Sequence, residues 1–378
     1  MVNGFFSLKY IGYVTDTEVF QNGGLAEYHL LFSHPSEYFL DIFKNEYNYP
    51  HAYSDIFSTH QSYWNDLRDN LVIKLASIFD LFSFGNYYIN VVFYNFVVFF
   101  GHLALFRVYA NYFPNKKTVL IISCFLLPSL LFFANFIHKD GLILAAIGII
   151  VFNIYQCYST KISVWRILYI LLAFLFIFLE RNFVAIMLVP AIIAWLTAES
   201  KKYRTIIVFI SVYILAALLF FNLHSFFNNI NPPQIIVQRQ MDYFNLPKAK
   251  SYLAIDSLEP TFKSFACIAP KALNHSLAHP YFSEIHLSKF ILPFTIEIFI
   301  YGLLIIFLII FNKAADYEVY WKLPFMLFGI FFSLSMFLTI GYTVPIIGSI
   351  IRYRSIYFPF LITPILCSIN CKVFKKKI

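Results

Sequence analysis

The chain has 378 residues, of which 60% are hydrophobic, 21% aromatic and only 13% charged. A soluble globular domain carries roughly 25% charged residues, so this chain has too little polar surface to coat a water-soluble fold. The composition therefore excludes a soluble enzyme, a disordered chain, a nucleic-acid-binding module and a disulfide-stapled secreted domain. It indicates an integral membrane protein. The five cysteines have no metal-finger spacing, and neither a zinc site nor a disulfide framework is predicted.

Nine apolar runs approach the length of about 20 residues that a membrane-spanning helix needs. They are 88–111, 118–136, 141–158, 164–180, 183–198, 205–223, 290–312, 321–341 and 354–371. The predicted fold is therefore all-α, a polytopic transmembrane helix bundle of about nine spans.

The basic residues set the expected orientation of this bundle. If the lysine-rich tail at 372–377 is cytosolic, alternation of the spans places five short segments in the cytosol. Their basic residues are Arg107, Lys116 and Lys117; Lys161 and Arg166; Lys201, Lys202 and Arg204; Lys313 and Lys322; and four tail lysines. The density of Lys and Arg is then far higher inside than outside, as the positive-inside rule requires.

This topology divides the chain into four regions. Residues 1–87 and 224–289 form extracytosolic regions, and residues 88–223 and 290–378 form the spanning bundle, the latter with the basic tail. Residues 1–87 contain neither a signal peptide nor a spanning run. We therefore expect one more helix upstream, or a misassigned start codon. Two stretches, 38–44 and 71–82, fit helices that lie on the membrane surface, whereas 224–289 is expected to be loop-like.

Charged residues near the expected extracytosolic face are candidates for function, because ionisable groups close to the bilayer are costly. They are His138, Lys139 and Asp140 between the second and third spans, Glu180 and Arg181 between the fourth and fifth, Arg352 and Arg354 at the last span, and Glu297 within the seventh. Lys139 and the three arginines suit an anionic headgroup, since guanidinium groups bind phosphate oxygens in pairs. Wet turns, snorkelling arginines and a hydrogen-bonded buried acid remain open alternatives.

The amino-terminal region supplies two acids, Asp16 and Glu18. A carboxylate beside a phosphate-binding cavity can act as a general base towards an acceptor hydroxyl. Aromatic residues of the same region fit sugar stacking or interfacial anchoring: Tyr10, Tyr13, Tyr28, Tyr47, Tyr49, Tyr53, Tyr63 and Trp64. His275 and His279 are four residues apart and His286 follows, but Pro280 comes directly after His279 and no nearby carboxylate pair completes a site, so no metal site is assigned.

The order of these features resembles the GT-C superfamily of integral membrane glycosyltransferases. Asp16 matches the acid of their first external loop, and 38–44 and 71–82 match their surface helices, although the first spanning helix is absent. Four segments are also similar to bacterial polytopic proteins of surface-polysaccharide assembly. They are Pro128-Ser129-Leu130…His138-Lys139-Asp140-Gly141, Glu180-Arg181-Asn182, Ala269-Pro270-Lys271-Ala272-Leu273…His279-Pro280-Tyr281-Phe282…Glu284 and Ile351-Arg352-Tyr353-Arg354.

The resemblance implies a transferase of the bacterial inner (cytoplasmic) membrane that takes a sugar from a polyprenyl-phosphate-linked donor. Asp16 would deprotonate the acceptor, and Lys139 and the arginines would hold the donor phosphate. No cofactor and no nucleic acid is implied, and a divalent metal stays open. A polymerase of lipid-linked repeat units, a transporter or flippase of lipid-linked glycan, and a non-catalytic scaffold are the alternatives. Glu297 favours transport, since a buried acid can relay protons.

Overall fold

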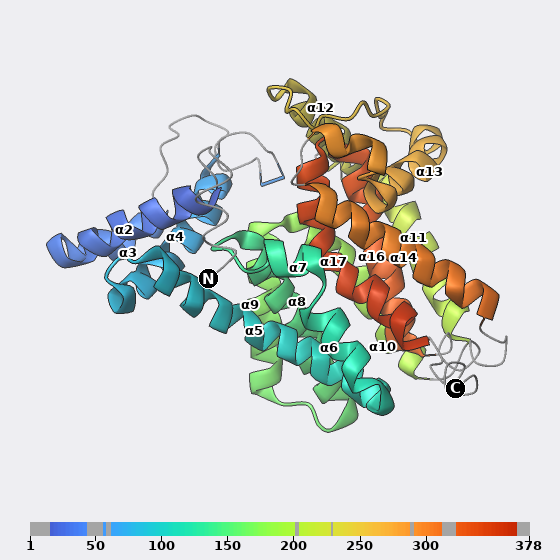
Figure 1. Cartoon of the computed structure of the whole chain (residues 1–378), viewed down its shortest axis with the longest axis horizontal. Coiled ribbons are helices and arrows are strands. Elements are labelled where there is room, and N and C mark those ends of the chain that lie inside the picture. Colours follow the sequence, from blue (N-terminus) through green and yellow to red (C-terminus); the bar gives the residue numbers. More distant parts are fainter. Residues whose placement is uncertain are drawn as a thin grey trace. The chain divides into compact units, whose positions relative to one another are not determined.

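The computed structural model describes residues 16–43, 56–57, 62–200, 204–227, 230–287, 291–311 and 323–368. Every named element in these ranges is a helix, which confirms the all-α prediction for them (Figure 1). The one β pairing within the same ranges is an isolated bridge between Tyr252 and Ile346. The chain divides into two compact units: residues 1–112 with 130–182 form unit 1, and residues 113–129 with 183–378 form unit 2.

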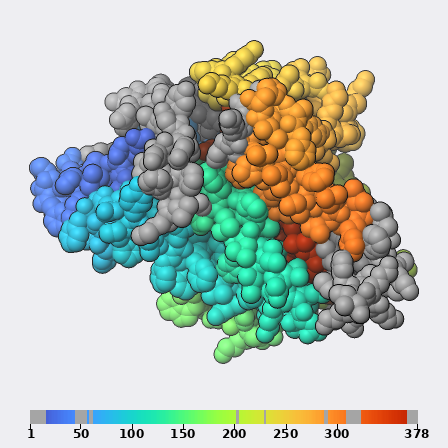
Figure 2. All heavy atoms as spheres, viewed as in Figure 1, coloured from blue at the N-terminus to red at the C-terminus, as the bar shows by residue number. Residues whose placement is uncertain are grey.

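Unit 1 combines a pair of amphipathic helices with a group of apolar ones. Its elements are α2 (Asp16–Ser33), α3 (Pro35–Leu40), the 3-10 turn η1 (Asp41–Phe43), α4 (Tyr63–Ser83), α5 (Tyr87–Tyr112), α8 (Lys139–Ser159) and α9 (Val164–Glu180). The short helix α7 (Pro128–Phe133) begins in unit 2 and ends in unit 1. The blue atoms of α2 and the lighter blue atoms of α4 lie against each other in Figure 2.

Polar ties hold α2, α3 and α4 together. Lys74 of α4 is buried, forms an ion pair with Glu27 of α2, and donates a hydrogen bond to the backbone carbonyl of Tyr38 in α3. Gly24 lets the backbones of α2 and α4 come close, because a Cβ at this position would stand 2.8 Å from the Cβ of Ala76. This compact arrangement fixes the position of α2, whose first residue is Asp16.

Small residues let α5 and α8 pack closely. A Cβ at Gly101 of α5 would stand 2.1 Å from the Cα of Ala145, and one at Gly148 of α8 would stand 2.3 Å from the carbonyl oxygen of Gly101. Such contacts are typical of helices that associate inside a membrane. Helices α8 and α9 pack against each other and are joined by residues 160–163. The start of α8 and the end of α9 therefore lie at the same end of unit 1.

Unit 2 contains the remaining helices. They are the 3-10 turn η2 (Pro114–Lys116), α6 (Lys117–Phe125), α10 (Asn182–Glu199), α11 (Thr205–Phe226), α12 (Pro232–Asn245), α13 (Phe262–Ala278), the 3-10 turn η3 (Phe282–Leu287), α14 (Leu292–Phe311), α16 (Pro324–Thr343) and α17 (Ile347–Ser368). Helix α16 is central, since α12, α13 and α17 all pack against it. Aromatic rings fill this core; Trp195 of α10 contacts both Phe325 and Phe328 of α16.

Among the described residues, six helices are long and apolar enough to cross a membrane: α5, α8, α10, α11, α16 and the 347–367 part of α17. The protein is therefore of the multi-pass membrane class. Helix α11 supports this assignment, because only 11% of its most apolar window is buried inside the protein. Its large exposed side chains, among them Leu215 and Leu218, require an apolar surrounding.

One of the other three expected spans is not a single helix. The run 118–136 is broken into α6 and α7, since Pro128 disfavours helix for the residue before it. The runs 164–180 and 290–312 each form one helix, α9 and α14, but α9 has only 17 residues and the apolar part of α14 covers only residues 292–307, so both are shorter than the six. Nine spans are therefore not confirmed. The last span begins at Ile347 instead of 354, which places Arg352 and Arg354 inside the helix rather than at its mouth.

The prediction that 224–289 is loop-like is wrong for much of its length, since α12 and α13 lie there. Two prolines begin α12: the Asn231 side chain caps the helix by accepting the Gln234 N–H at 3.2 Å, and Pro232 and Pro233 occupy its first positions. Thr261 caps α13 in the same way, through the Ser264 N–H. Proline is favourable at the first turn of a helix because no hydrogen bond is lost there.

The two expected surface helices exist, with different boundaries. Residues 38–43 are shared by α3 and η1, and 71–82 belongs to the longer α4. Phe39, Leu40, Phe43 and Phe82 are all more than 60% exposed. These apolar side chains fit a position on a bilayer surface, which stays a prediction.

Candidate functional site

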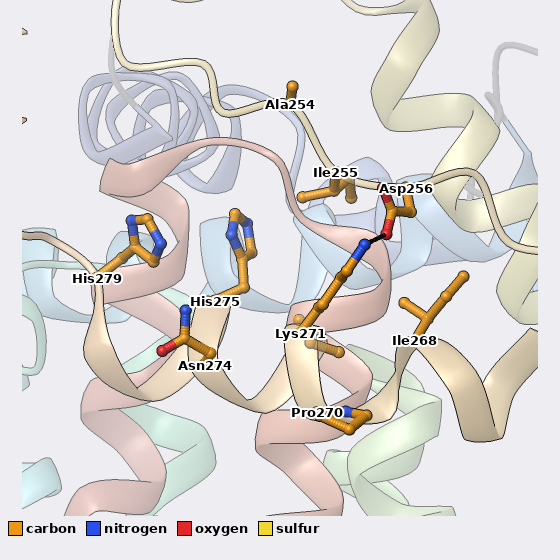
Figure 3. Close-up of a pocket in the computed structure, with 11 residues that line it drawn as sticks. Ala254, Ile255, Asp256, Ile268, Pro270, Lys271, Asn274, His275 and His279 are labelled. Atoms are coloured by element: carbon orange, nitrogen blue, oxygen red, sulfur yellow. Dashed lines mark hydrogen bonds and ion pairs between the residues drawn. The ribbon is translucent and has the colours of Figure 1, made fainter.

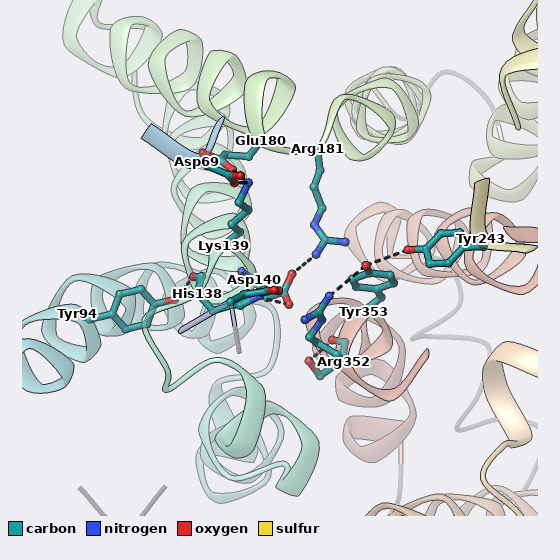
Figure 4. A network of polar contacts seen from close by, with 12 residues as sticks. Asp69, Tyr94, His138, Lys139, Asp140, Glu180, Arg181, Tyr243, Arg352 and Tyr353 are labelled. Atoms are coloured by element: carbon teal, nitrogen blue, oxygen red, sulfur yellow. Dashed lines mark hydrogen bonds and ion pairs between the residues drawn. The ribbon is translucent and has the colours of Figure 1, made fainter. Parts of the chain in front are cut away.

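A chain of charged side chains runs across the end of unit 1 where α8 begins and α9 ends (Figure 4). His138 precedes α8 and caps it, since its Nδ1 lies 3.2 Å from the backbone N of Asp140. The other ring nitrogen, Nε2, lies 3.0 Å from Oδ2 of Asp16. Tyr94 of α5 donates a hydrogen bond to the backbone carbonyl of His138, which fixes the residue from a third side.

Asp140 continues this chain towards α9. Its Oδ2 lies 3.0 Å from Nδ1 of His138, and its Oδ1 lies 2.5 Å from Nη2 of Arg181, the residue that ends α9. The carboxylate is 1% exposed, so both contacts are shielded from water. An acid in the first turn of α8 and a cation at the end of α9 also match the dipoles of these helices.

The chain ends at an accessible acid. The side chain of Asp16 is 56% exposed, whereas His138 is 9% and Arg181 11% exposed. The buried His138 thus holds the Asp16 carboxylate at a position that is accessible to solvent. Asp16, at the start of α2, contacts His138 across 122 positions of sequence. The resulting series is carboxylate, imidazole, carboxylate and guanidinium.

Lys139 forms a second set of contacts beside the first. Its Nζ lies 2.6 Å from Oδ1 of Asp69 in α4 and 3.5 Å from Oε2 of Glu180. The Glu180 side chain is fully buried, and neither of its oxygens has a hydrogen-bond partner among the described residues. A buried carboxylate needs nearby cations. Lys139 supplies one such cation, and Arg68 of α4 also interacts electrostatically with the Glu180 carboxylate.

Arg68 and Asp69 belong to this second set of contacts, although they were not predicted from the sequence as site residues. Burial lowers the pKa of Arg68, and the negative charges of Glu180 and Asp69 oppose this effect. The Arg68 guanidinium also donates to the carbonyl of Ile56. Arg68 and Asp69 lie three and two positions before residue 71, where the surface helix was predicted to begin. In the structure this helix begins earlier, at Tyr63. Charges at Asp66, Arg68 and Asp69 beside an apolar stretch were the available signal.

Opposite charges face one another in this cluster. Arg68, Lys139 and Arg181 face the carboxylates of Asp69, Asp140 and Glu180, while Asp16 approaches the His138 ring. The cations are therefore held in fixed positions by two buried acids, Asp140 and Glu180, and by the more exposed Asp69. Such an arrangement can stabilise negative charge that develops next to it, and its exposed carboxylate can accept a proton.

Arg354, in unit 2, has partners of a different kind. Its side chain is completely buried, and Nη1 donates to the carbonyls of Ser276, Leu277 and His279 at the end of α13. The guanidinium also lies over the Phe358 ring at 4.8 Å. These contacts tie α17 to α13, so the geometry favours a structural role for Arg354 over the expected phosphate contact.

Glu297 of α14 is likewise held by fixed partners. Its Oε2 accepts the Ser129 N–H at 3.0 Å, and its Oε1 accepts the Ser129 hydroxyl at 3.0 Å and the Tyr301 hydroxyl at 2.6 Å. The residue is 2% exposed, and Arg354 attracts it electrostatically. Three hydrogen bonds and a buried cation stabilise one arrangement of this acid, which is the structural alternative raised from the sequence.

Arg352 is half-buried on the same helix as Arg354. Its Nη2 lies 3.2 Å from the hydroxyl of Tyr353, which in turn lies 3.0 Å from the hydroxyl of Tyr243 (Figure 4). Unlike Arg354, Arg352 is partly exposed, and it stays a candidate for binding an anionic group.

The other sequence candidates are placed as follows. Glu18 is half-buried in the first turn of α2, and Tyr63 and Trp64 begin α4 with their rings 5.3 Å apart. Tyr10, Tyr13, Tyr47, Tyr49 and Tyr53 lie outside the described residues, as do Lys201, Lys202, Lys313, Lys322 and the tail at 372–377. Within the described part of the chain, no three His, Cys, Asp or Glu side chains are grouped so that they could hold a metal ion.

Comparisons with known proteins give no match: neither a protein-family model, nor a curated protein, nor a solved structure is similar to this chain.

Proposed function

We propose that this protein is a GT-C-like membrane glycosyltransferase with its active centre in unit 1. It transfers a sugar from a polyprenyl-phosphate-linked donor to an acceptor hydroxyl at the extracytosolic face of the bacterial inner membrane, in surface-glycan assembly. The observation that carries the proposal is the exposed carboxylate of Asp16 beside the buried side chains of His138, Asp140 and Arg181.

Asp16 acts as the general base in this proposal. Its carboxylate takes the proton of the acceptor hydroxyl as that oxygen attacks the anomeric carbon of the donor sugar. The bond between the anomeric carbon and the phosphate oxygen breaks, and its electron pair leaves with the polyprenyl phosphate. His138 positions Asp16 through the 3.0 Å contact at Nε2, while the backbone N–H of Asp140, which donates to Nδ1, fixes the orientation of the imidazole ring.

The leaving phosphate needs positive charge that is already in place. Lys139 and Arg181 supply it from the start of α8 and the end of α9, and Arg68 supplies it from α4. Their carboxylate partners keep these cations charged and oriented, so little reorganisation accompanies the reaction. Arg181 offers a planar donor group that matches phosphate oxygens.

The position of the cluster supports a lipid-linked donor. Helices α5 and α8 are long and apolar enough to span a bilayer, and the cluster lies at the start of α8. A spanning helix ends at the headgroup region, where a phosphate attached to a polyprenyl chain also lies. The exposed apolar side chains of α5, such as Phe96 and Phe100, offer contacts for the chain.

The proposal is tested by replacing Asp16 with Asn in a strain that depends on this gene for its surface glycan. We expect loss of the glycan with unchanged protein abundance in the membrane. Glu18→Gln separates the two candidate acids, and Glu37→Gln, at an exposed site in α3, serves as the matched control that retains the glycan. Normal glycan in the Asp16→Asn strain would remove the general base and with it this mechanism.

A polymerase and a transporter predict other outcomes in the same strain. Loss of a polymerase leaves single repeat units on the carrier lipid, whereas loss of a single-sugar transferase leaves an acceptor one residue short, which mass spectrometry distinguishes. A proton-coupled transporter requires an acid that changes partners. The three hydrogen bonds of Glu297 speak against that role for the residue that favoured transport.

A further inference from the structure

A pocket of about 440 Å³ lies in unit 2 beside α13 (Figure 3). Its walls are the segment 254–256, one face of α13 between Ile268 and His275, the following residue His279, and Gly341 of α16. The volume is within the range of sites that hold small molecules, roughly 300–1,000 Å³. None of these residues belongs to the charged cluster of unit 1.

The walls of this pocket are fixed by contacts on both sides. The backbone of 251–253 is anchored by two hydrogen bonds, from Leu253 N–H to the Pro345 carbonyl at 2.7 Å and from Ile347 N–H to the Ser251 carbonyl at 3.1 Å. The side chain of Gln240 then bonds both the Asp256 carbonyl and the Leu258 N–H. The segment 251–258 is therefore held in place before any ligand arrives.

The floor of the pocket is equally tight. A Cβ at Gly341 would stand 1.9 Å from the carbonyl oxygen of Ala272, so α13 and α16 touch through their backbones. Only glycine allows this approach. A preformed pocket binds without the entropy loss of ordering a loop.

The polar groups of the pocket are donors and acceptors of hydrogen bonds. His275 uses Nε2 to contact the Val344 carbonyl at 3.1 Å, which leaves Nδ1 as an acceptor. His279 uses Nδ1 to contact Glu284, which leaves its Nε2 for a ligand. Asn274 accepts the Tyr281 hydroxyl through Oδ1 at 3.0 Å, and its amide NH₂ remains for a ligand.

The charges of the pocket compensate one another. Lys271 and Asp256 form an ion pair at 2.6 Å, and His279 faces Glu284 at 2.8 Å. The pocket also lies along the final turns of α13, whose carbonyl end carries a partial negative charge. This arrangement presents carboxylates as well as cations to a ligand, which suits hydroxyl groups better than an anion.

Apolar side chains alternate with these polar ones. Ile255, Ile268 and Pro270 line the same cavity as Asn274 and His275. A dry lipid chain would leave the polar groups without partners, which is costly. A pyranose ring presents hydroxyls at its edge and C–H groups on its faces, and it satisfies both kinds of wall.

We propose that this pocket binds a neutral saccharide unit. Asn274, His279 and Asp256 bond its hydroxyls, and Ile255 and Ile268 contact its faces. The assignment of this sugar as part of the acceptor rests on the proposed transferase function, whereas its binding to the pocket does not.

The test is ligand-observed saturation-transfer NMR on the purified full-length protein in detergent. The probes are the methyl glycosides of glucose, galactose and N-acetylglucosamine at millimolar concentration, with inorganic phosphate titrated in parallel. We expect saturation transfer to at least one glycoside and no competition by phosphate. Asn274→Ala weakens binding about tenfold, since loss of one hydrogen bond amounts to about 1.4 kcal/mol.

Two Ala→Trp variants complete the test. Ala254→Trp adds a large ring at an exposed residue that lines the pocket and is expected to abolish binding, while Ala266→Trp, at an exposed position of α13 outside the pocket, preserves it. Absence of transfer to every glycoside, equal transfer in Ala254→Trp, or displacement by phosphate overturns the proposal. A strain with normal glycan in Asp16→Asn and glycoside binding lost only in Ala254→Trp would instead reject the transferase mechanism and keep the saccharide site.

Discussion

Arg181 and Asp140 join the end of α9 to the start of α8, with Nη2 and Oδ1 2.5 Å apart and both side chains shielded from water. This ion pair closes the helical hairpin at the end where Asp16 and His138 meet. Removing one partner leaves the other charge buried without this counter-charge, which typically destabilises a protein more than removing both.

A double-mutant cycle measures this coupling. Arg181→Met and Asp140→Leu are each expected to lower the free energy of unfolding by about 3–5 kcal/mol, whereas the double variant loses less than the sum of the two. The measurement is the melting temperature (Tm) of the detergent-solubilised protein. Additive losses would mean that the two charges do not stabilise each other.

Arg352 and Arg354 are expected to respond oppositely to substitution. Arg354→Met removes the donor that satisfies three carbonyls of α13 and leaves Glu297 as a buried charge. We expect a loss of about 3–5 kcal/mol and low abundance in the membrane. Arg352→Gln, on a half-buried residue of the same helix, is the matched control, and its abundance should stay near that of the unaltered protein. Normal abundance of Arg354→Met would contradict the structural role.

The sequence predicted features that depend on local composition. Apolar length located α5, α8, α10, α11 and α16 within a few residues, because a run of apolar side chains is itself the requirement for spanning a membrane. Proline was less informative: Pro128 breaks a helix, Pro232 begins one, and Pro270 lies within one. The outcome at each depends on whether the lost backbone hydrogen bond matters at that position.

The candidate site depended on contacts that are distant in sequence. His138, Asp140, Glu180 and Arg181 were selected because charges near a bilayer are costly, and unit 1 brings them close together. Arg354 was selected by the same rule, yet its partners are backbone carbonyls 75 to 78 positions away. Charge identifies a costly side chain, and only tertiary packing decides whether that side chain meets a ligand or a helix end.

His275 makes stability depend on pH. Burial, together with the nearby His279, lowers its pKa from 6.5 to about 4, while the Val344 carbonyl and Glu284 act in the opposite direction. Between pH 6.5 and about pH 4, His275 is therefore neutral in the folded protein, whereas it binds a proton in the unfolded chain. Stability contributed at this site is therefore complete above pH 6.5 and falls as the pH drops towards 4, by about 3 kcal/mol.

The Tm of the unaltered protein and of His275→Gln, compared between pH 7.5 and pH 4.5, checks this expectation. The unaltered protein should lose stability relative to the variant as the pH falls, since glutamine can donate to the Val344 carbonyl without titrating. A difference in Tm that is constant across this range would show that His275 titrates normally.

Gly101 is expected to tolerate no side chain. Gly101→Ala would place a Cβ 2.1 Å from the Cα of Ala145 and push α5 away from α8. Such overpacking costs about 1–3 kcal/mol. Gly302→Ala in α14, where a Cβ meets nothing within 4 Å, is the control and should raise stability slightly, because alanine favours helix. Equal Tm values for the two variants would contradict the close packing of α5 and α8.

Asp80 of α4 is expected to be more stable as an amide. The residue is fully buried, and its Oδ1 accepts the Asn90 side-chain N–H at 2.5 Å, while Oδ2 has no hydrogen-bond partner in the described residues. No Lys or Arg among the described residues forms an ion pair with Asp80. Asp80→Asn keeps the acceptor for Asn90 and removes a buried charge, so the Tm should stay equal or rise. Asp80→Leu leaves one N–H of the Asn90 amide without its acceptor, while the bond to Gln21 remains, and is expected to lose about 1–3 kcal/mol. If Asp80→Asn destabilises the protein as much as Asp80→Leu, the negative charge itself is required, and a cation must stand beside Oδ2 in the folded protein.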